Sequence, residues 1–359
     1  MDSIFLSDNS GMKKKMFYKV IGLFLLALVA GIIVWGTNIY HRIYMPNVLV
    51  PDSSITYLYI PTGSDFDDVV DRIKENEMVE NVSSFIWLAE KKNYPNHVYP
   101  GRYALQHEMN NNKIINLLRS GYQEPVKVIF NSIRTKEQLA GRIAKQIEAD
   151  SLALLNAFTN DSIIKDYGFK PETFTCIFIP NTYEFWWNTT AESFVQRMYK
   201  EYQRFWTANR LTKAKTINLT PVDVITLASI VDEETIFNDE MQKVAGVYIN
   251  RLRKRMHLQA DPTLKFALGD FSIKRVLTVH KLIDSPYNTY KRYGLPPGPI
   301  SIPSIAAIDA VLNYEQHHYL YFCAKPDFSG YHNFAKTLSQ HNINARKYQR
   351  ALNREKIWR

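Results

Sequence analysis

The apolar segment near the N-terminus constrains this chain more than any other feature of its sequence. Residues 20–36 (VIGLFLLALVAGIIVWG) carry no charge, and the uncharged run continues to Tyr40. This is about the 20 residues that a helix needs to cross a bilayer. The lysines that precede the segment are Lys13, Lys14, Lys15 and Lys19. By the positive-inside rule, we expect residues 1–19 to be a cytoplasmic tail, residues 20–40 a transmembrane helix, and the rest of the chain extracytoplasmic.

A cleaved signal peptide and a buried core helix are the alternative interpretations of this segment. A signal peptide has an apolar core of about 7 to 15 residues and then a small-x-small cleavage site, and residues 27–30 (ALVA) miss that pattern. A core helix of a soluble protein is usually polar on one side, whereas this segment is apolar on all faces. We therefore expect a protein anchored by one membrane-spanning helix.

Composition indicates a folded, basic chain of more than one domain. With 359 residues, 46% hydrophobic and 22% charged, the chain has enough apolar material for packed cores, which excludes disorder. The 44 Lys and Arg exceed the 35 Asp and Glu, a balance that suits a membrane surface or an anionic polymer. The basic residues are scattered and form no cluster with aromatic residues, so we expect no nucleic-acid partner.

The sequence predicts neither a metal site nor a cofactor site. Cys176 and Cys323 lie far apart without a metal-binding spacing, and whether they pair is left open. Phosphate-binding glycine loops and the dinucleotide-binding fingerprint are also absent from the sequence. We therefore expect chemistry carried out by side chains alone.

Turn residues and periodicity divide the remainder of the chain into three parts. Residues 41–55, with two prolines, are expected to be an extended tether. Residues 56–122 are expected to form a small α+β module, and residues 123–359 a larger α+β domain. Within them the patterns predict strands over 56–60, 101–105, 126–130 and 319–323, and helices from a Ser64 N-cap and over 82–91, 112–120, 135–149, 221–235 and 239–255. The predicted fold class is therefore α+β.

The helix over 221–235 carries the candidate catalytic residue. It begins at Thr220-Pro221, which is a favourable N-cap and first position. At 100° per residue, Glu234 continues an apolar stripe, whereas Asp232 and Glu233 point away from it. A desolvated glutamate has a raised pKa and keeps its proton, as a general acid must. The alternative is a buried ion pair between Glu234 and an arginine of the next helix: Arg251, Arg253 or Arg255.

Five segments occur in one order along the second half of the chain. They are residues 227–235 (LASIVDEET), 247–252 (VYINRL), 258–263 (LQADPT), 287–290 (YNTY) and 294–300 (GLPPGPI). In this combination the chain resembles the endolytic murein transglycosylases, the MltG or YceG-like family. The resemblance covers nearly the whole chain and implies a cytoplasmic tail, one transmembrane helix, a LysM-like module at 56–122 and a catalytic domain at 123–359. It also implies a place in the bacterial cytoplasmic (inner) membrane, with the N-terminus inside.

The resemblance implies a lyase that cuts nascent peptidoglycan and so terminates glycan elongation. The bond cleaved is the β-1,4 link between N-acetylmuramic acid and N-acetylglucosamine, and the product has a 1,6-anhydromuramoyl end. The family's catalytic glutamate falls on Glu234. One glutamate can act as acid and then base because the muramoyl 6-hydroxyl is the internal nucleophile, whereas hydrolases need two carboxylates. The motif positions expected to contact substrate are Gln259, Asp261, Thr263, Tyr287, Asn288 and Tyr290.

The sequence departs from the family pattern at two places. Asp232 stands where the family often has a glutamate, so Asp232 and Glu233 are the alternatives to Glu234. Thr175-Cys176 stands where the family tends to carry Glu-Gly. Two other functions also stay open, namely a non-catalytic peptidoglycan-binding scaffold and a hydrolase that uses a second carboxylate such as Asp261. The implied partners are peptidoglycan glycan strands, and then peptidoglycan synthases and division or elongation proteins.

Overall fold

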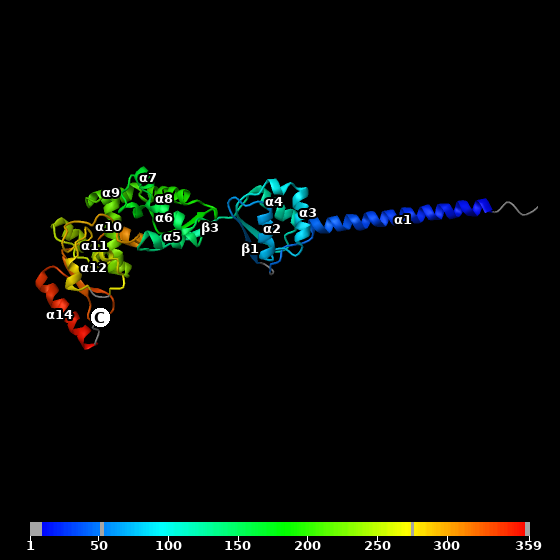
Figure 1. The fold of residues 1–359 in the computed structure, drawn as a ribbon. Helices are drawn as coiled ribbons and strands as arrows, with labels where there is room; N and C mark the ends of the chain where they lie inside the picture. The colour runs from blue at the N-terminus through cyan, green and yellow to red at the C-terminus, as the bar shows by residue number, and fades with distance from the viewer. Residues whose placement is uncertain (1–8, 51–53, 274–275, 356–359) are drawn as a thin grey trace, which may run out of the picture. The chain divides into compact units, whose positions relative to one another are not determined.

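The computed structural model describes residues 9–50, 54–273 and 276–355 (Figure 1). It divides into two compact units, Met1–Pro125 and Val126–Arg359. Both contain helices and short antiparallel strand pairs, which confirms the prediction of a mixed helix and strand fold. Parts of the expected tail (1–8), tether (51–53) and larger domain (274–275 and 356–359) lie outside the described residues.

Helix α1 (Asn9–Tyr44) contains the predicted membrane span. Its stretch from Lys13 to Tyr44 is long and apolar enough to cross a membrane, and its most apolar window is not buried against the protein. The helix continues beyond residue 40 because the next helix-breaking residue is Pro46. This helix is compatible with a single-pass membrane anchor.

The described part of the segment expected to be an extended tether, residues 41–50, contacts the module that follows. Residues 41–44 belong to α1, and Pro46 and Val48 form isolated bridges with residues 110 and 79. Asn47 is buried, and its amide donates to Asn111 Oδ1 over 2.6 Å. These contacts join the end of α1 to the module that follows.

The small module is built on one antiparallel strand pair. Its elements are β1 (Ile55–Ile60), α2 (Phe66–Glu75), α3 (Val82–Lys91), η1 (Tyr94–Asn96), β2 (Gly101–Gln106) and α4 (Asn111–Ser120). Strand β1 pairs with β2 in a register that places Ile55 opposite Gln106. Helix α2 begins one residue later than predicted, because Asp65 rather than Ser64 is its N-cap. The Asp65 and Asp68 carboxylates accept reciprocal backbone hydrogen bonds of 3.0 Å, and negative charge is favourable at that helix end.

The second unit has two hydrophobic cores. The elements around the first are β3 (Val126–Ile129), α5 (Lys136–Ala144), α6 (Ser151–Thr159), α7 (Asp161–Asp166), η2 (Phe174–Ile177), β4 (Thr182–Phe185) and α8 (Ala191–Phe205). Strands β3 and β4 are antiparallel. Helix α5 ends at Ala144, short of the predicted residue 149, and the Gln146 amide instead bonds both backbone groups of Ile129, over 2.8 and 3.1 Å.

The second core surrounds helix α10 (Pro221–Glu234). The other elements of this region are α9 (Ala208–Thr216), α11 (Asn238–Arg253), α12 (Asp261–Leu268), η3 (Thr278–Leu282), α13 (Ile305–Leu312), β5 (Tyr321–Ala324), β6 (His332–Ala335) and α14 (Leu338–Arg354). The predicted start of α10 is confirmed by a capping box between Thr220 and Asp223. Every residue from Val224 to Val231 is buried, so the apolar stripe that Glu234 continues is one side of a helix whose middle is buried all round. Helices α9, α11, α12 and α13 all contact α10.

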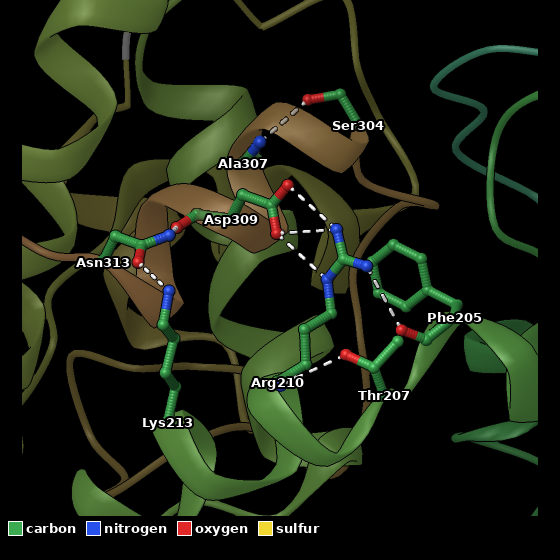
Figure 2. A network of polar contacts seen from close by, with 8 residues as sticks. All are labelled: Phe205, Thr207, Arg210, Lys213, Ser304, Ala307, Asp309 and Asn313. Carbon is green, nitrogen blue, oxygen red and sulfur yellow. Dashed lines mark hydrogen bonds and ion pairs between the residues drawn. The ribbon is translucent and has the colours of Figure 1, made fainter.

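A polar network fixes α13, which packs against α10 (Figure 2). Arg210 of α9 donates to Asp309 of α13 through Nε and Nη2, over 3.1 and 3.0 Å. Its guanidinium also lies 4.0 Å from the centre of the Phe205 ring. At the start of α13, the Ser304 hydroxyl accepts a hydrogen bond from the Ala307 backbone. These contacts hold in place one side of the helix that ends at Glu234.

Candidate active site

A polar cavity lies beside the C-terminal end of α10. Its volume is about 450 Å³, and its wall comes from α10, α11, the turn before α12, the β5–β6 hairpin and the start of α14. Acidic, basic, amide and phenolic side chains line this wall, among them Glu234, Tyr248, Arg251, Gln259, Asp261 and Tyr290. The cavity therefore brings together residues from four of the five sequence segments.

Glu234 is the last residue of α10 and is partly buried in the cavity wall. Its Oε1 accepts a hydrogen bond of 2.6 Å from the Tyr248 hydroxyl. Removal from water raises the pKa of Glu234 to about 7, with a further upward contribution from the Asp261 carboxylate. The Tyr248 hydrogen bond and the charges of Lys265 and Arg251 act in the opposite direction. At neutral pH this carboxyl group can therefore both give and accept a proton.

Tyr248 of α11 holds the Glu234 side chain in one orientation. Its ring is buried, and burial together with the adjacent Glu234 raises the pKa of the phenol well above its usual value. The hydroxyl therefore keeps its proton and acts as a hydrogen-bond donor. The hydrogen bond stabilises the ionised form of Glu234 without removing the carboxyl group from the cavity.

The two acidic residues before Glu234 have structural partners. Asp232 accepts hydrogen bonds from the hydroxyls of Ser132 and Ser304, over 2.7 and 2.6 Å. Glu233 forms a two-pronged ion pair with Arg134, with nitrogen–oxygen distances of 3.0 and 2.8 Å. Both side chains tie the end of α10 to neighbouring loops. Of the three consecutive acids, Glu234 alone lines the cavity that the described residues enclose.

The structure does not contain the ion pair that was the alternative role for Glu234. Within residues 9–50, 54–273 and 276–355, no salt bridge joins Glu234 to Arg251, Arg253 or Arg255. Arg251 is buried and donates to the backbone carbonyls of Leu320 and Leu258, over 2.6 and 2.7 Å. It therefore connects α11 to two loops of the cavity wall and adds positive charge beside Glu234.

Three of the six predicted substrate contacts lie in the cavity wall. Gln259 and Asp261 flank the start of α12, and Tyr290 joins them from the loop before residue 294. The Tyr290 hydroxyl donates to Asp261 Oδ1 over 2.5 Å. Gln259 has a φ of +51°, and its backbone N–H donates to the Thr289 carbonyl over 3.1 Å. This strained turn presents the side chains of residues 259 and 261 at the cavity.

The other three predicted contacts lie outside the wall that the described residues form. Thr263 is fully buried, and its hydroxyl donates to the Ala260 carbonyl over 2.7 Å. Asn288 is also fully buried, and its amide donates to the Ile283 carbonyl over 2.7 Å. The Tyr287 ring packs against Phe266 with a centroid distance of 4.6 Å. These side chains hold the turns that carry Gln259 and Tyr290.

Sequence reasoning missed several residues of the cavity wall. Tyr248 lies three residues before Arg251 in the segment VYINRL and so shares a helix face with it. Because Arg251 was already considered as a partner of Glu234, this spacing could have identified Tyr248. The hairpin and α14 contribute residues that no local pattern links to Glu234: Tyr321, Phe322, Cys323, His332 and His341. Cys323 and the buried Cys176 are both free thiols. Across the described part of the chain, no group of three His, Cys, Asp or Glu side chains could hold a metal ion.

Comparisons with known proteins give consistent results. The YceG-like family matches residues 58–347. An endolytic murein transglycosylase of Bacillus subtilis (strain 168) is 30% identical over 340 residues, which cover 88% of this chain and 91% of that protein. A protein of the same name from Streptococcus pneumoniae (strain D39) is 28% identical over 297 residues, covering 74% of this chain and 53% of the relative. A crystal structure of a yceG-like protein from Listeria monocytogenes matches with a TM-score of 0.54 and 29% identity, covering 80% of this chain and 98% of that one.

Proposed function

The chain belongs to the YceG-like family, and on that premise we propose that it is an endolytic lytic transglycosylase of peptidoglycan. The proposed reaction cleaves the bond between N-acetylmuramic acid and N-acetylglucosamine and leaves a 1,6-anhydromuramoyl end. The observation that carries the proposal is Glu234, whose pKa of about 7 and 2.6 Å bond to Tyr248 suit one group to act as acid and as base.

In the proposed mechanism, protonated Glu234 first acts as the acid. It gives its proton to the glycosidic oxygen while the bond between that oxygen and the anomeric carbon breaks. The Glu234 carboxylate then accepts the proton of the muramoyl 6-hydroxyl, whose oxygen bonds to the anomeric carbon. The nucleophile belongs to the substrate, so no second carboxylate is required. Tyr248 stabilises the carboxylate between the two steps through its hydrogen bond.

The hydrogen bonds of Asp232 and the ion pair of Glu233 support the assignment of Glu234 as the catalytic acid and base. Both carboxylates are bound by serine hydroxyls or by Arg134, so neither is free to approach a substrate in the cavity. Asp261 is the other carboxylate of the cavity wall, and it accepts the Tyr290 hydroxyl. In a hydrolase Asp261 would activate water, so the chemical form of the product end distinguishes the two reactions.

Mass spectrometry of the cleavage products tests the proposal. The full chain in detergent is incubated with uncrosslinked glycan strands, beside Glu234→Gln and the control Glu192→Gln, whose side chain is exposed on α8. We expect anhydromuramoyl ends from the unmodified chain and the control, and none from Glu234→Gln. Reducing ends would indicate a hydrolase, and binding without cleavage by the unmodified chain would indicate a scaffold.

We extend the proposal to the first unit and its surroundings. The order of strand, two helices and strand in Ile55–Gln106 is consistent with a LysM-like glycan-binding module. Helix α1 would anchor the protein in the bacterial cytoplasmic membrane with its N-terminus inside, which places the second unit next to newly made strands. Peptidoglycan synthases and division or elongation proteins are the proposed partners. Failure of crosslinking in membranes to recover any of them would count against that part.

A further inference from the structure

A histidine held by a buried glutamate forms part of the same cavity wall as Glu234. Glu240 of α11 is only 6% exposed, and His332 begins strand β6. One carboxylate oxygen accepts the His332 backbone N–H over 2.8 Å, and the other lies 2.7 Å from the ring Nδ1. Because an ionised carboxylate only accepts hydrogen bonds, Nδ1 carries a proton in this pair. When the ring is the neutral imidazole, the other ring nitrogen, Nε2, is a hydrogen-bond acceptor.

Nε2 of His332 is available to a ligand. Among residues 9–50, 54–273 and 276–355, no side chain or backbone group bonds to it, and it is not enclosed. The His332 side chain keeps 12% of its surface exposed, and the residue lines the cavity. The accessible edge of the ring therefore faces the space in which a substrate would bind.

The fold fixes the position of His332 relative to Glu234. The Phe322 ring meets the His332 ring edge to face at 5.1 Å and the Tyr248 ring in the same way at 5.8 Å. Helix α11 carries both Glu240 and Tyr248, which are eight residues and so about 12 Å apart along its axis. Helix α11 therefore orients the proposed acid through Tyr248 and the histidine through Glu240, at two separate places along its length. This separation favours contact with a part of the substrate away from the cleaved bond.

We propose that His332 is a substrate-binding residue of the cavity, whose Nε2 accepts a hydrogen bond from a hydroxyl or amide N–H of the bound glycan. The inference rests on the proposed function, because it takes the ligand to be a saccharide. Sugar rings present several hydroxyls, and an acceptor fixed by a second hydrogen bond selects one orientation of such a donor. Glu240 acts through His332 and is a positioning residue.

Binding measurements on a variant that cannot cleave test the role of His332. The parent is the full chain with Glu234→Gln in detergent, and the ligand is a tetrasaccharide of alternating N-acetylglucosamine and N-acetylmuramic acid. In His332→Asn, the amide takes the place of Nδ1 and keeps the bond to Glu240, but nothing replaces Nε2. We expect its Kd, measured by calorimetry, to rise about 3- to 10-fold, with a melting temperature within about 2 °C of the parent.

The controls separate binding from folding. The exposed histidine of the same unit, changed in His318→Asn, should leave Kd unchanged. Glu240→Gln allows the proton to move to Nε2 and should weaken binding as His332→Asn does. A Kd for His332→Asn within twofold of the parent would overturn the proposal, as would a parent that does not bind the tetrasaccharide. A parent that binds, beside an unmodified chain that makes no anhydro ends, would overturn the proposed reaction and leave the His332 result standing.

Discussion

The ionisation of Glu234 sets the pH range in which the cavity can supply a proton. Its pKa is about 7, and the first proposed step requires the protonated form. We expect kcat/KM on glycan strands to fall about tenfold for each pH unit above 7. The control Glu192→Gln should follow the same curve. A rate that stays constant up to pH 9 would contradict Glu234 as the acid.

Tyr248 should shift this pH limit, because its hydrogen bond lowers the pKa of Glu234. In Tyr248→Phe the bond is lost while the buried ring is retained, so the pKa of Glu234 rises. We expect the alkaline limb of the activity profile to move to higher pH and the maximal rate to decrease, because the carboxylate formed in the first step loses its donor. A limb that does not move would show that the Tyr248 hydrogen bond does not lower the pKa of Glu234.

Glu234 should also couple stability to pH. The folded-state pKa lies above the unfolded value of 4.5, so the stabilising proton is bound below that value and lost as pH rises through about 7. Glu234→Gln cannot ionise and avoids this loss. Between pH 5 and pH 8 we expect its unfolding free energy to gain about 1 to 3 kcal/mol relative to the unmodified chain. Thermal unfolding at both pH values measures the gain, and equal losses in the two proteins would contradict the pKa.

At the residue scale, motif positions indicated the neighbourhood of the site better than they indicated contact. The prediction of a desolvated Glu234 agrees with its raised pKa, and the helix that carries it is buried from Val224 to Val231. Thr263 and Asn288 share motifs with Asp261 and Tyr290 but face backbone carbonyls. A sequence motif does not specify which way a side chain points. That direction is set by the geometry of the turn, which forms only in the folded chain.

The packing of α11 against the segment before β5 depends on Gly246. A Cβ at this position would lie 2.5 Å from the Glu315 carbonyl oxygen and 2.7 Å from His317 Nε2. Gly246→Ala should therefore displace the segment that leads to the β5–β6 hairpin. We expect a loss of about 1 to 3 kcal/mol in unfolding free energy and weaker glycan binding.

Gly141 of α5 provides a matched control for this substitution. A Cβ at residue 141 would meet no atom within 4 Å, so Gly141→Ala should be neutral or add up to about 1 kcal/mol of helix stability. Denaturant unfolding of both variants tests the pair. Equal changes in unfolding free energy at the two positions would show that Gly246 is not required for the close approach of residues 315 and 317 to α11.

At the element scale, local signals identified helix starts well and ends poorly. The Thr220 cap predicted the first residue of α10, and the helix predicted over 82–91 coincides with α3. The end of α5 was missed because it depends on Gln146 reaching β3, a contact between separate elements. Strand β6 pairs with β5 after a short loop and was not predicted from the sequence.

At the scale of the molecule, residues 46–48 determine how much of the N-terminal part of the chain can be removed without destabilising the first unit. Asn47 and Val48 are buried in the first unit, and the Asn81 backbone N–H donates to Asn47 Oδ1 over 2.7 Å. A chain that begins at residue 41 should stay in solution and keep its first unit folded. A chain that begins at residue 54 should lose roughly 2 to 4 kcal/mol of that unit's stability.

Ultracentrifugation and thermal unfolding of the two shortened chains test this expectation. The full chain, which retains α1, serves as the reference that sediments with membranes. Equal melting temperatures for the two shortened chains would show that residues 46–48 add nothing to the first unit. Sedimentation of the longer one with membranes would show that anchoring does not depend on α1.

The division into units and the linking segment depend on different kinds of information in the sequence. The boundary falls between Pro125 and Val126, close to the predicted start of the larger domain at 123. The contacts of residues 46–49 reach partners near residues 79–81 and 109–111, which lie far away in the chain. Prolines report local conformation and carry no information about such pairing.

The three successive acids at the end of α10 limit how this helix can change over evolution. Its start is fixed by the Thr220 cap, and its end by the partners of Asp232 and Glu233. One inserted residue would turn the last carboxylate by about 100° and move it by about 1.5 Å. Each of the three acids would then lie beside the hydrogen-bonding partner that now binds the adjacent acid. Mutations that exchange one apolar residue for another preserve this register, so α10 can drift in composition, whereas insertions and deletions within it should be eliminated.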